Sequence, residues 1–248
     1  MGKELELHGL PVYTTGDGET VIVIITDPFG WNHPDARFLA DTLARSTSAT
    51  VWMPDFFSGD SLPAEQLALL TPPSGELSFF EKSASVLKRS QAFAPWLFAH
   101  REGVSWPIIE RFFESAYNEK PLRPLIAAGY GWGGRYAALL THREKWTTTS
   151  GTYKEGGFIH SAFVAHPILM TADELEKCER PVTMVLGDAE EVGGFKKLQA
   201  AAQKKGIKCE LLEGAQQGFA LHQGKSAMEK RYWEKSRDLA VEWAREYL

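Results

Sequence analysis

The segment Leu125–Arg135 constrains the fold more than any other part of the sequence. It reads Leu-Ile-Ala-Ala-Gly-Tyr-Gly-Trp-Gly-Gly-Arg, an apolar run that leads through closely spaced glycines into a helical pattern. Glycines permit the sharp strand-to-helix turn of a nucleophile elbow. The glycine spacing and the absence of a following Lys-Ser or Lys-Thr pair argue against a phosphate loop. The pattern therefore predicts a strand, a tight turn centred on Gly131 and a helix.

Short apolar runs alternate with helical patterns along most of the remaining chain. This alternation is typical of an α/β fold with a mainly parallel central sheet and helices on both faces. No repeat, low-complexity tract or linker divides the sequence, so we expect a single domain over residues 1–248. The predicted strands are 21–25, 50–53, 125–129, 157–166, 181–186 and 209–212, and the predicted helices are 34–46, 134–141, 195–205 and 226–247.

The stretch 61–123 interrupts this alternation. It contains helical patterns but no convincing strand, so we expect a helical insertion or lid-like segment near the pocket. Most of its aromatic side chains are expected in the core, some could line a ligand site, and the segment could contribute a homodimer face. These aromatic residues are Phe79, Phe80, Phe93, Trp96, Phe98, Trp106, Phe112 and Phe113.

Composition excludes several classes of function. The net charge is −5, from 32 acidic and 27 basic residues, and the basic residues are scattered, so nucleic acid is not an expected partner. The two cysteines, Cys178 and Cys209, predict no disulfide framework and fit a reducing compartment. No apolar run approaches the length that spans a membrane, and we expect a cytoplasmic protein. No metal-ligand spacing or dinucleotide fingerprint is present, so neither a metal nor a cofactor is expected.

Five short motifs, in order along nearly the whole chain, resemble those of the dienelactone hydrolase family. The resemblance implies the α/β-hydrolase fold, with an acidic-x-Phe-Gly loop, a Pro-Asp-aromatic loop, an elbow and two segments that carry the acid and base of a triad. The corresponding segments are Thr26–Asn32, Met53–Gly59, Gly129–Gly134, Val185–Glu190 and Gln217–Ala220.

The family hydrolyses esters or lactones with a Cys, His and Asp triad, and this sequence departs from it at each position. The resemblance places Gly131 at the nucleophile, Gln217 at the base and Glu190 at the acid. Gly131 has no side chain, and Gln217 cannot exchange protons near neutral pH. Pro28 occupies the loop position of the second oxyanion donor and has no N–H, which leaves the Trp132 amide as the surviving donor. A triad acts as a unit, so covalent hydrolysis is not expected.

We expect the glycine to open volume where a substrate carbonyl would sit. The substrate-binding residues implied by the motifs are Pro28, Phe29, Trp31, Tyr130, Gly131 and Trp132. An apolar pocket with a few polar groups suits an aromatic or conjugated small molecule. The favoured hypothesis is a cyclase, isomerase or lyase that acts on a conjugated, polyketide-like carbonyl substrate by positioning and hydrogen bonding. The alternatives are a non-catalytic carrier and, less favoured, a hydrolase that activates water directly.

Four residues are candidates for the catalytic groups: Asp27, His166, Glu190 and Gln217. His166 ends a predicted strand at the edge of the sheet where this fold binds ligands, although a structural hydrogen bond at the strand end is the more usual role of such a histidine. Burial could raise the pKa of the Asp27 or the Glu190 carboxyl group towards neutrality. His222 follows the Gln217 loop and could turn towards the pocket, but we expect it to be exposed.

Overall fold

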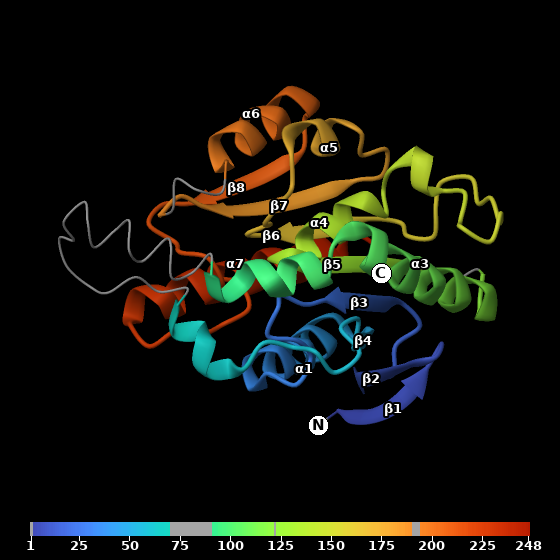
Figure 1. Cartoon of the computed structure of the whole chain (residues 1–248), viewed down its shortest axis with the longest axis horizontal. Helices are drawn as coiled ribbons and strands as arrows, with labels where there is room; N and C mark the ends of the chain where they lie inside the picture. Colours follow the sequence, from blue (N-terminus) through green and yellow to red (C-terminus); the bar gives the residue numbers. More distant parts are fainter. Residues whose placement is uncertain (1, 70–90, 122, 190–193) are drawn as a thin grey trace.

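The protein is described as a computed structural model, which covers residues 2–69, 91–121, 123–189 and 194–248. Its centre is an eight-stranded sheet in the order β1-β2-β4-β3-β5-β6-β7-β8 (Figure 1). This arrangement confirms the predicted α/β-hydrolase fold. The strands are β1 (Lys3–Leu7), β2 (Leu10–Thr15), β3 (Val21–Ile25), β4 (Thr50–Pro54), β5 (Leu125–Tyr130), β6 (Ala162–Ala165), β7 (Val182–Gly187) and β8 (Lys208–Leu212).

The strands from β4 to β8 are parallel, whereas β2 is antiparallel to both of its neighbours. The parallel strands are almost entirely buried, as expected for strands covered on both faces. The β1–β2 hairpin was not predicted, because β1 is largely exposed and its sequence is not a continuous apolar run. The predicted strand 157–166 was too long, since only Ala162–Ala165 pairs with its neighbours.

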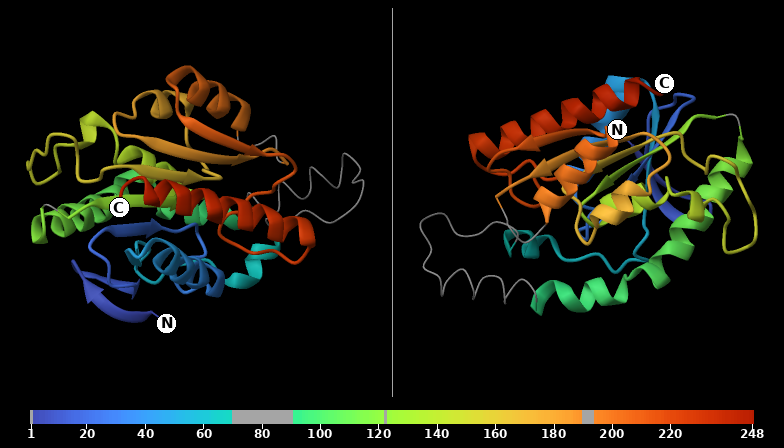
Figure 2. Two further views of the ribbon diagram at one scale, coloured as in Figure 1. Left: turned by 180° about the vertical axis from the view of Figure 1, so that it is seen from behind. Right: turned by 90° about the horizontal axis from the view of Figure 1, so that it is seen from above.

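Each face of the sheet packs against its own layer of helices (Figure 2). Within β3, Val21, Val23 and Ile25 join the core on one face, while Ile22 and Ile24 join the core on the other. This division follows from the two-residue period of a strand. The first face is covered by α3 (Glu102–Glu119), α4 (Trp132–Leu139), α5 (Ala172–Glu176) and α6 (Phe195–Lys205), and the second by α1 (Pro34–Thr47) and α7 (Ala227–Arg245).

The sequence patterns located the long helices well. The predicted helix 195–205 coincides with α6, and the helix predicted at 226–247 corresponds to α7, whose capping box is formed by Ser226 and Glu229. The helix predicted at 134–141 begins two residues earlier, because α4 starts at Trp132, directly after the turn. The strand–turn–helix prediction at Gly131 is therefore confirmed.

The stretch 61–123 contains helices and no strand within its described part. A 3-10 helix, η1, spans Ala64–Leu69, a helical stretch covers 91–99, and α3 follows, while 70–90 and 122 lie outside the described residues. Trp106, Phe112 and Phe113 are buried in the core, as expected for most of the aromatic residues. Phe98 is exposed and Phe93 partly buried, whereas Phe79 and Phe80 lie outside the description.

Cys178 and Cys209 are both free thiols. Among the described residues, no helix combines the length and apolar character that crossing a bilayer requires.

Candidate active site at the turn between β5 and α4

The register of three parallel strands brings the site residues to one level. Ile25 of β3 lies opposite Gly129 of β5, and Tyr130 lies opposite Ala165 of β6. The residues that follow these strands therefore meet at the carboxyl edge of the sheet, where ligands bind in this fold. Asp27, Gly131 and His166 are the three residues that this register gathers.

Gly131 forms the turn between β5 and α4. Its backbone has φ +55° and ψ −113°, a region that residues with side chains adopt only with strain. The amide of Gly131 donates to the Ala165 carbonyl (3.0 Å), and its carbonyl accepts from the Ile168 amide (3.1 Å). The close passage of α4 over β3 also depends on glycine, since a Cβ at Gly133 would collide with the Ile25 carbonyl. The turn thus has the conformation of a nucleophile elbow with no nucleophile.

The space above Gly131 is closed, which contradicts the expected open volume. A Cβ built on Gly131 would lie 3.0 Å from the Cβ of Asp27, 3.4 Å from Cε1 of His166 and 3.5 Å from its Nδ1. These separations are tight or ordinary van der Waals contacts. The side chains of Asp27 and His166 have therefore packed over the turn, since an empty space would forfeit their dispersion contacts.

His166 is held in place by Gln217. The Gln217 side-chain amide donates to Nδ1 of His166 (2.9 Å) and to its backbone carbonyl (2.7 Å). The His166 backbone has φ +37°, unusual for a residue with a side chain. Gln217 thus occupies the expected place beside the turn, where it orients an imidazole instead of replacing one.

The His166 ring is neutral at physiological pH. Burial lowers its pKa to about 4, an effect that the Asp27 carboxylate partly opposes and His222 reinforces. Because Nδ1 accepts a hydrogen bond, the single ring proton of the neutral form is on Nε2. Nε2 is buried and has no hydrogen-bond partner among the described residues. The site therefore contains an unused imidazole N–H donor.

Asp27 is hydrogen-bonded to a histidine that is not among the predicted catalytic residues. Oδ2 of Asp27 lies 2.7 Å from Nε2 of His222, and Oδ1 accepts from the Phe29 amide (3.0 Å). Burial alone would raise the pKa of Asp27, but His222, His166 and the Phe29 amide outweigh it and hold the pKa below its ordinary value. The expectation that His222 is exposed is wrong, because it packs its ring edge-on against Phe29 and is only 6% exposed.

A hollow of about 400 Å³, including its open mouth, adjoins His166 and Gln217 beyond the ends of β6 and β7. Most of this volume is open to solvent, and the centre of a water-sized sphere can occupy only about 40 Å³ of it, which is small for a site that takes a drug-sized molecule. Its remaining walls are mainly apolar and include Leu186, Phe195, Leu198 and Phe219. Among the described residues, His166 and Gln217 are the predicted catalytic residues that line this hollow.

Most of the predicted substrate-binding residues are core residues instead. Tyr130 is buried against Phe163, which raises the pKa of its hydroxyl strongly, and Phe29 and Trp31 are also buried. The Trp132 ring packs against Phe57, and its indole N–H donates to the His100 carbonyl. None of these four side chains lines the hollow beside His166, although Trp132 borders a second hollow together with His100 and Tyr136.

The backbone around the turn offers few free hydrogen-bond donors. Pro28 is buried and its carbonyl accepts from the Leu62 amide, so the loop offers no N–H at that position. Among the described residues, none accepts a hydrogen bond from the Trp132 amide at the start of α4. Glu190, the predicted acid, lies outside the described residues.

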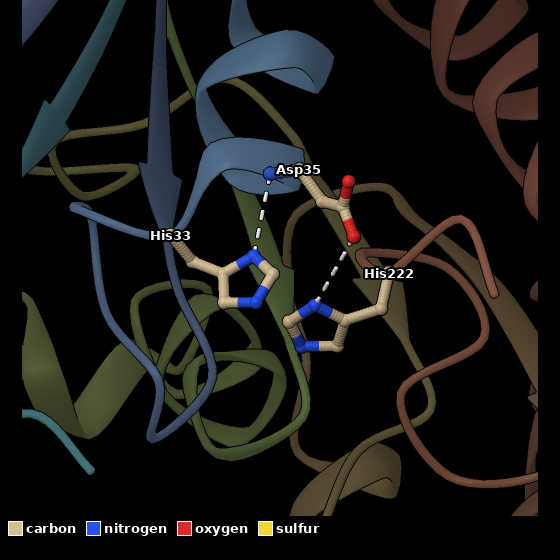
Figure 3. A group of neighbouring side chains, drawn as sticks. All are labelled: His33, Asp35 and His222. Atoms are coloured by element: carbon tan, nitrogen blue, oxygen red, sulfur yellow. Dashed lines mark hydrogen bonds and ion pairs between the residues drawn. The ribbon is translucent and has the colours of Figure 1, made fainter. Parts of the chain in front are cut away.

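Three potential metal ligands lie on the other side of the Asp27–His222 pair. His33, Asp35 and His222 each place one ligand atom within 4.8 Å of the other two (Figure 3). The sequence separation of these residues has no metal-ligand signature, so spacing alone could not reveal them. The nearest sequence signal is the short His-Pro-Asp segment at the start of α1.

Comparisons with known proteins support the fold and the general class. No family model matches the chain. The chain is 26% identical to Hydrolase tropI of Talaromyces stipitatus over an alignment of 233 residues. This alignment covers 92% of this chain and 81% of that protein. It is 20% identical to the human carboxymethylenebutenolidase homolog over an alignment of 259 positions. This alignment covers 100% of this chain and 92% of that protein.

Solved structures of dienelactone hydrolases and esterases have the same fold as this chain. Dienelactone hydrolase from Anabaena variabilis has a TM-score of 0.57 at 13% identity, with 100% of this chain and 97% of that chain covered. Thermogutta terrifontis esterase 2 has a TM-score of 0.57 at 15% identity, with 99% and 94% covered. The chain is thus dienelactone hydrolase-like, has the α/β-hydrolase fold, and has relatives named as hydrolases.

Proposed function

We propose that this dienelactone hydrolase-like chain is a non-hydrolytic enzyme: a cyclase, isomerase or lyase that acts on an aromatic or conjugated carbonyl compound. The observation that carries the proposal is the neutral His166 beside an elbow with no nucleophile. Gly131 offers no atom that could form an acyl-enzyme, and Gln217 uses its amide to orient His166. The nucleophile and base positions therefore hold no nucleophile and no base, and Gln217 serves to orient His166.

His166 supplies the chemistry that this proposal needs. A neutral imidazole with its proton on Nε2 can donate a hydrogen bond to a carbonyl oxygen as negative charge develops there, without first losing a proton. The low pKa of His166, about 4, keeps it in this form at neutral pH. The adjoining hollow is lined mainly by apolar residues, which suit a conjugated skeleton whose carbonyl oxygen is directed to the imidazole, and the hollow must widen to admit it.

Asp27 has a supporting role in this scheme. Both of its oxygens are engaged, one by His222 and the other by the Phe29 amide, and its pKa lies below the ordinary value. A carboxylate of this kind is a weak base, so we assign it to the electrostatics of the site and the orientation of His222. Glu190 remains a proposed second acid on the segment after β7.

Two alternatives remain as competing hypotheses. A carrier would use the same hollow for binding without turnover, and the hydrogen bond from His166 would then contribute only to affinity. Hydrolysis by a directly activated water is favoured by one observation, the names of the relatives, which are hydrolases. It is less consistent with the geometry at the elbow, since Nδ1 of His166, the ring nitrogen that could accept a proton there, is engaged by the Gln217 amide.

The test is to incubate the purified protein with a panel of conjugated carbonyl compounds (dienones, hydroxy-enones and β-diketones) and to identify products by mass spectrometry and NMR. Isomerisation or cyclisation leaves the mass unchanged, a lyase splits the substrate without adding water, and hydrolysis adds the mass of one water. We expect a product without added water, formed faster than in buffer.

Variants separate catalysis from binding. His166→Asn keeps an acceptor for the Gln217 amide but removes the imidazole N–H, and we expect turnover to fall about 100-fold, the effect of losing one transition-state donor. The matched control is His160→Asn, because His160 is exposed and precedes the same strand. Binding without turnover in the wild type would favour the carrier, and a product that contains added water would refute the proposal.

A further inference from the structure

We propose that His33, Asp35 and His222 bind a divalent transition-metal ion, with Zn²⁺ as the first choice. His33 caps the N-terminus of α1, Asp35 lies in its first turn, and His222 comes from the loop before α7 (Figure 3). Two imidazoles and one carboxylate are the donor set of many zinc sites with an open fourth position. The inference does not depend on the proposed carbonyl chemistry.

The strongest support is the state of the His222 ring. Nδ1 of His222 is buried and has no hydrogen-bond partner among the described residues, and it points towards Asp35, whose Oδ2 is 3.9 Å away. This distance is too long for a hydrogen bond. A buried ring nitrogen without a partner is rare in a folded protein, and an ion between the two groups would satisfy it.

The other nitrogen of His222 is already arranged as in a metal site. Nε2 lies 2.7 Å from the buried Asp27 carboxylate. Metal-binding histidines almost always donate their second ring N–H to a carboxylate or carbonyl, which fixes the tautomer and increases the basicity of the coordinating nitrogen. With the proton on Nε2, the lone pair of Nδ1 is available to an ion. Asp27 would therefore act as the outer-shell partner.

The distances permit coordination after small side-chain rotations. Tetrahedral Zn²⁺ with bonds of about 2.1 Å requires ligand atoms roughly 3.4 Å apart. The ligand atoms here lie within 4.8 Å of one another, and the His222–Asp35 pair is at 3.9 Å. His33 and Asp35 are partly exposed, so both side chains can rotate and solvent can reach the fourth position.

Charge also favours a cation at this place. Asp35 and Asp27 bring two carboxylates to the pair of imidazoles, and no Lys or Arg forms an ion pair with either of them within the described chain. The two rings, His33 and His222, are already edge to face with centroids 4.5 Å apart. A divalent ion would neutralise both carboxylates at once.

Binding requires the exchange of one weak hydrogen bond. Nδ1 of His33 accepts a 3.3 Å capping bond from the Asp35 amide. This bond is given up whichever ring nitrogen coordinates, because Nδ1 either lends its lone pair to the ion or takes up the ring proton. The Asp35 amide is at a partly exposed helix end, where water can replace the cap.

The experiment measures metal binding directly. Protein treated with a chelator and then freed of it is titrated with ZnCl₂ by calorimetry, and the site is monitored independently with Co²⁺, whose visible absorption reports tetrahedral coordination. We expect one ion per chain. His33→Asn retains a good helix cap and Asp35→Asn retains the side-chain shape. Each should weaken binding by more than the roughly 10- to 100-fold expected for loss of an outer-shell partner.

His160→Asn is the matched control and should leave the affinity unchanged, and circular dichroism verifies that each variant is folded. Asp27→Asn should weaken binding about 10- to 100-fold. Absence of stoichiometric binding, or an affinity that both His33→Asn and Asp35→Asn leave unchanged, would overturn the proposal. An unaltered affinity in Asp27→Asn would overturn the outer-shell assignment. None of these readouts depends on an enzymatic substrate, so failure here is distinct from failure of the proposed function.

Discussion

The buried neutral imidazole of His166 should make the protein less stable as the pH falls below neutrality. Its pKa is about 4 in the folded protein, against 6.5 for an ordinary histidine. The unfolded chain therefore takes up a proton at higher pH than the folded chain does. Proton uptake by the unfolded state lowers the free energy of unfolding, so the stability is complete above about pH 6.5 and is lost as the pH falls towards 4.

The magnitude follows from the two pKa values. Each pH unit between them corresponds to about 1.4 kcal/mol, so the full effect is about 3 kcal/mol and the effect at about pH 5 is about 2 kcal/mol. Burial also lowers the pKa of His8, His33 and His142, which act in the same direction. The contribution of His166 must therefore be isolated by substitution.

The assay is urea denaturation of the wild type and His166→Asn at about pH 7.5, 6 and 5, with His160→Asn as control. Asparagine does not titrate, so the variant should lose about 2 kcal/mol less than the wild type between the first and last conditions. The absolute stability of the variant is not the readout. Equal pH dependence of the wild type and His166→Asn would refute the reasoning, because it would mean that His166 titrates normally in the folded protein.

Three further substitutions test the packing around the site, each by urea denaturation at neutral pH. Gly131→Ala should destabilise the protein by about 1–3 kcal/mol, more than the control Gly206→Ala. Both glycines have a positive φ, but only a side chain at 131 would press against Asp27 and His166. Equal losses of stability would show that this contact costs nothing. Asp27→Asn should cost about 1.5–3 kcal/mol by weakening the buried hydrogen bond between the Asp27 carboxylate and His222; a change under about 1 kcal/mol would contradict the importance of that bond. Ser161→Ala should cost about 1–3 kcal/mol by leaving the buried Trp243 indole N–H without its acceptor; a neutral effect would show that water replaces it.

The fold was predictable because its parallel strands and long helices leave local patterns. Val21–Ile25 is a continuous apolar run that can only be buried on both sides, and Phe195–Lys205 is amphipathic and ends at a glycine. The elbow was predictable because its conformation requires glycine at close spacing. The β1–β2 hairpin escaped prediction because an edge hairpin carries exposed polar residues and no such run.

The site was less predictable because it depends on contacts between distant segments. The Asp27–His222 pair joins residues 195 positions apart, and nothing in the local sequence around His222 indicates that it is buried. The expectation of an open space at Gly131 failed for a related reason. The sequence shows that a side chain is missing, but only the structure shows that Asp27 and His166 fill its place.

The central claim, that the elbow site is not hydrolytic, is tested most directly by the hydrolysis of activated esters and lactones. The wild type is compared with the Gly131→Cys, Gln217→His double variant, which restores a nucleophile and a base at the turn. A Cβ at Gly131 would lie 3.5 Å from the Nδ1 of His166, so the introduced thiol would enter an imidazole-lined site. We predict no turnover above buffer for the wild type and measurable turnover for the double variant. Turnover by the wild type that His166→Asn abolishes would contradict the account and assign hydrolysis to a directly activated water.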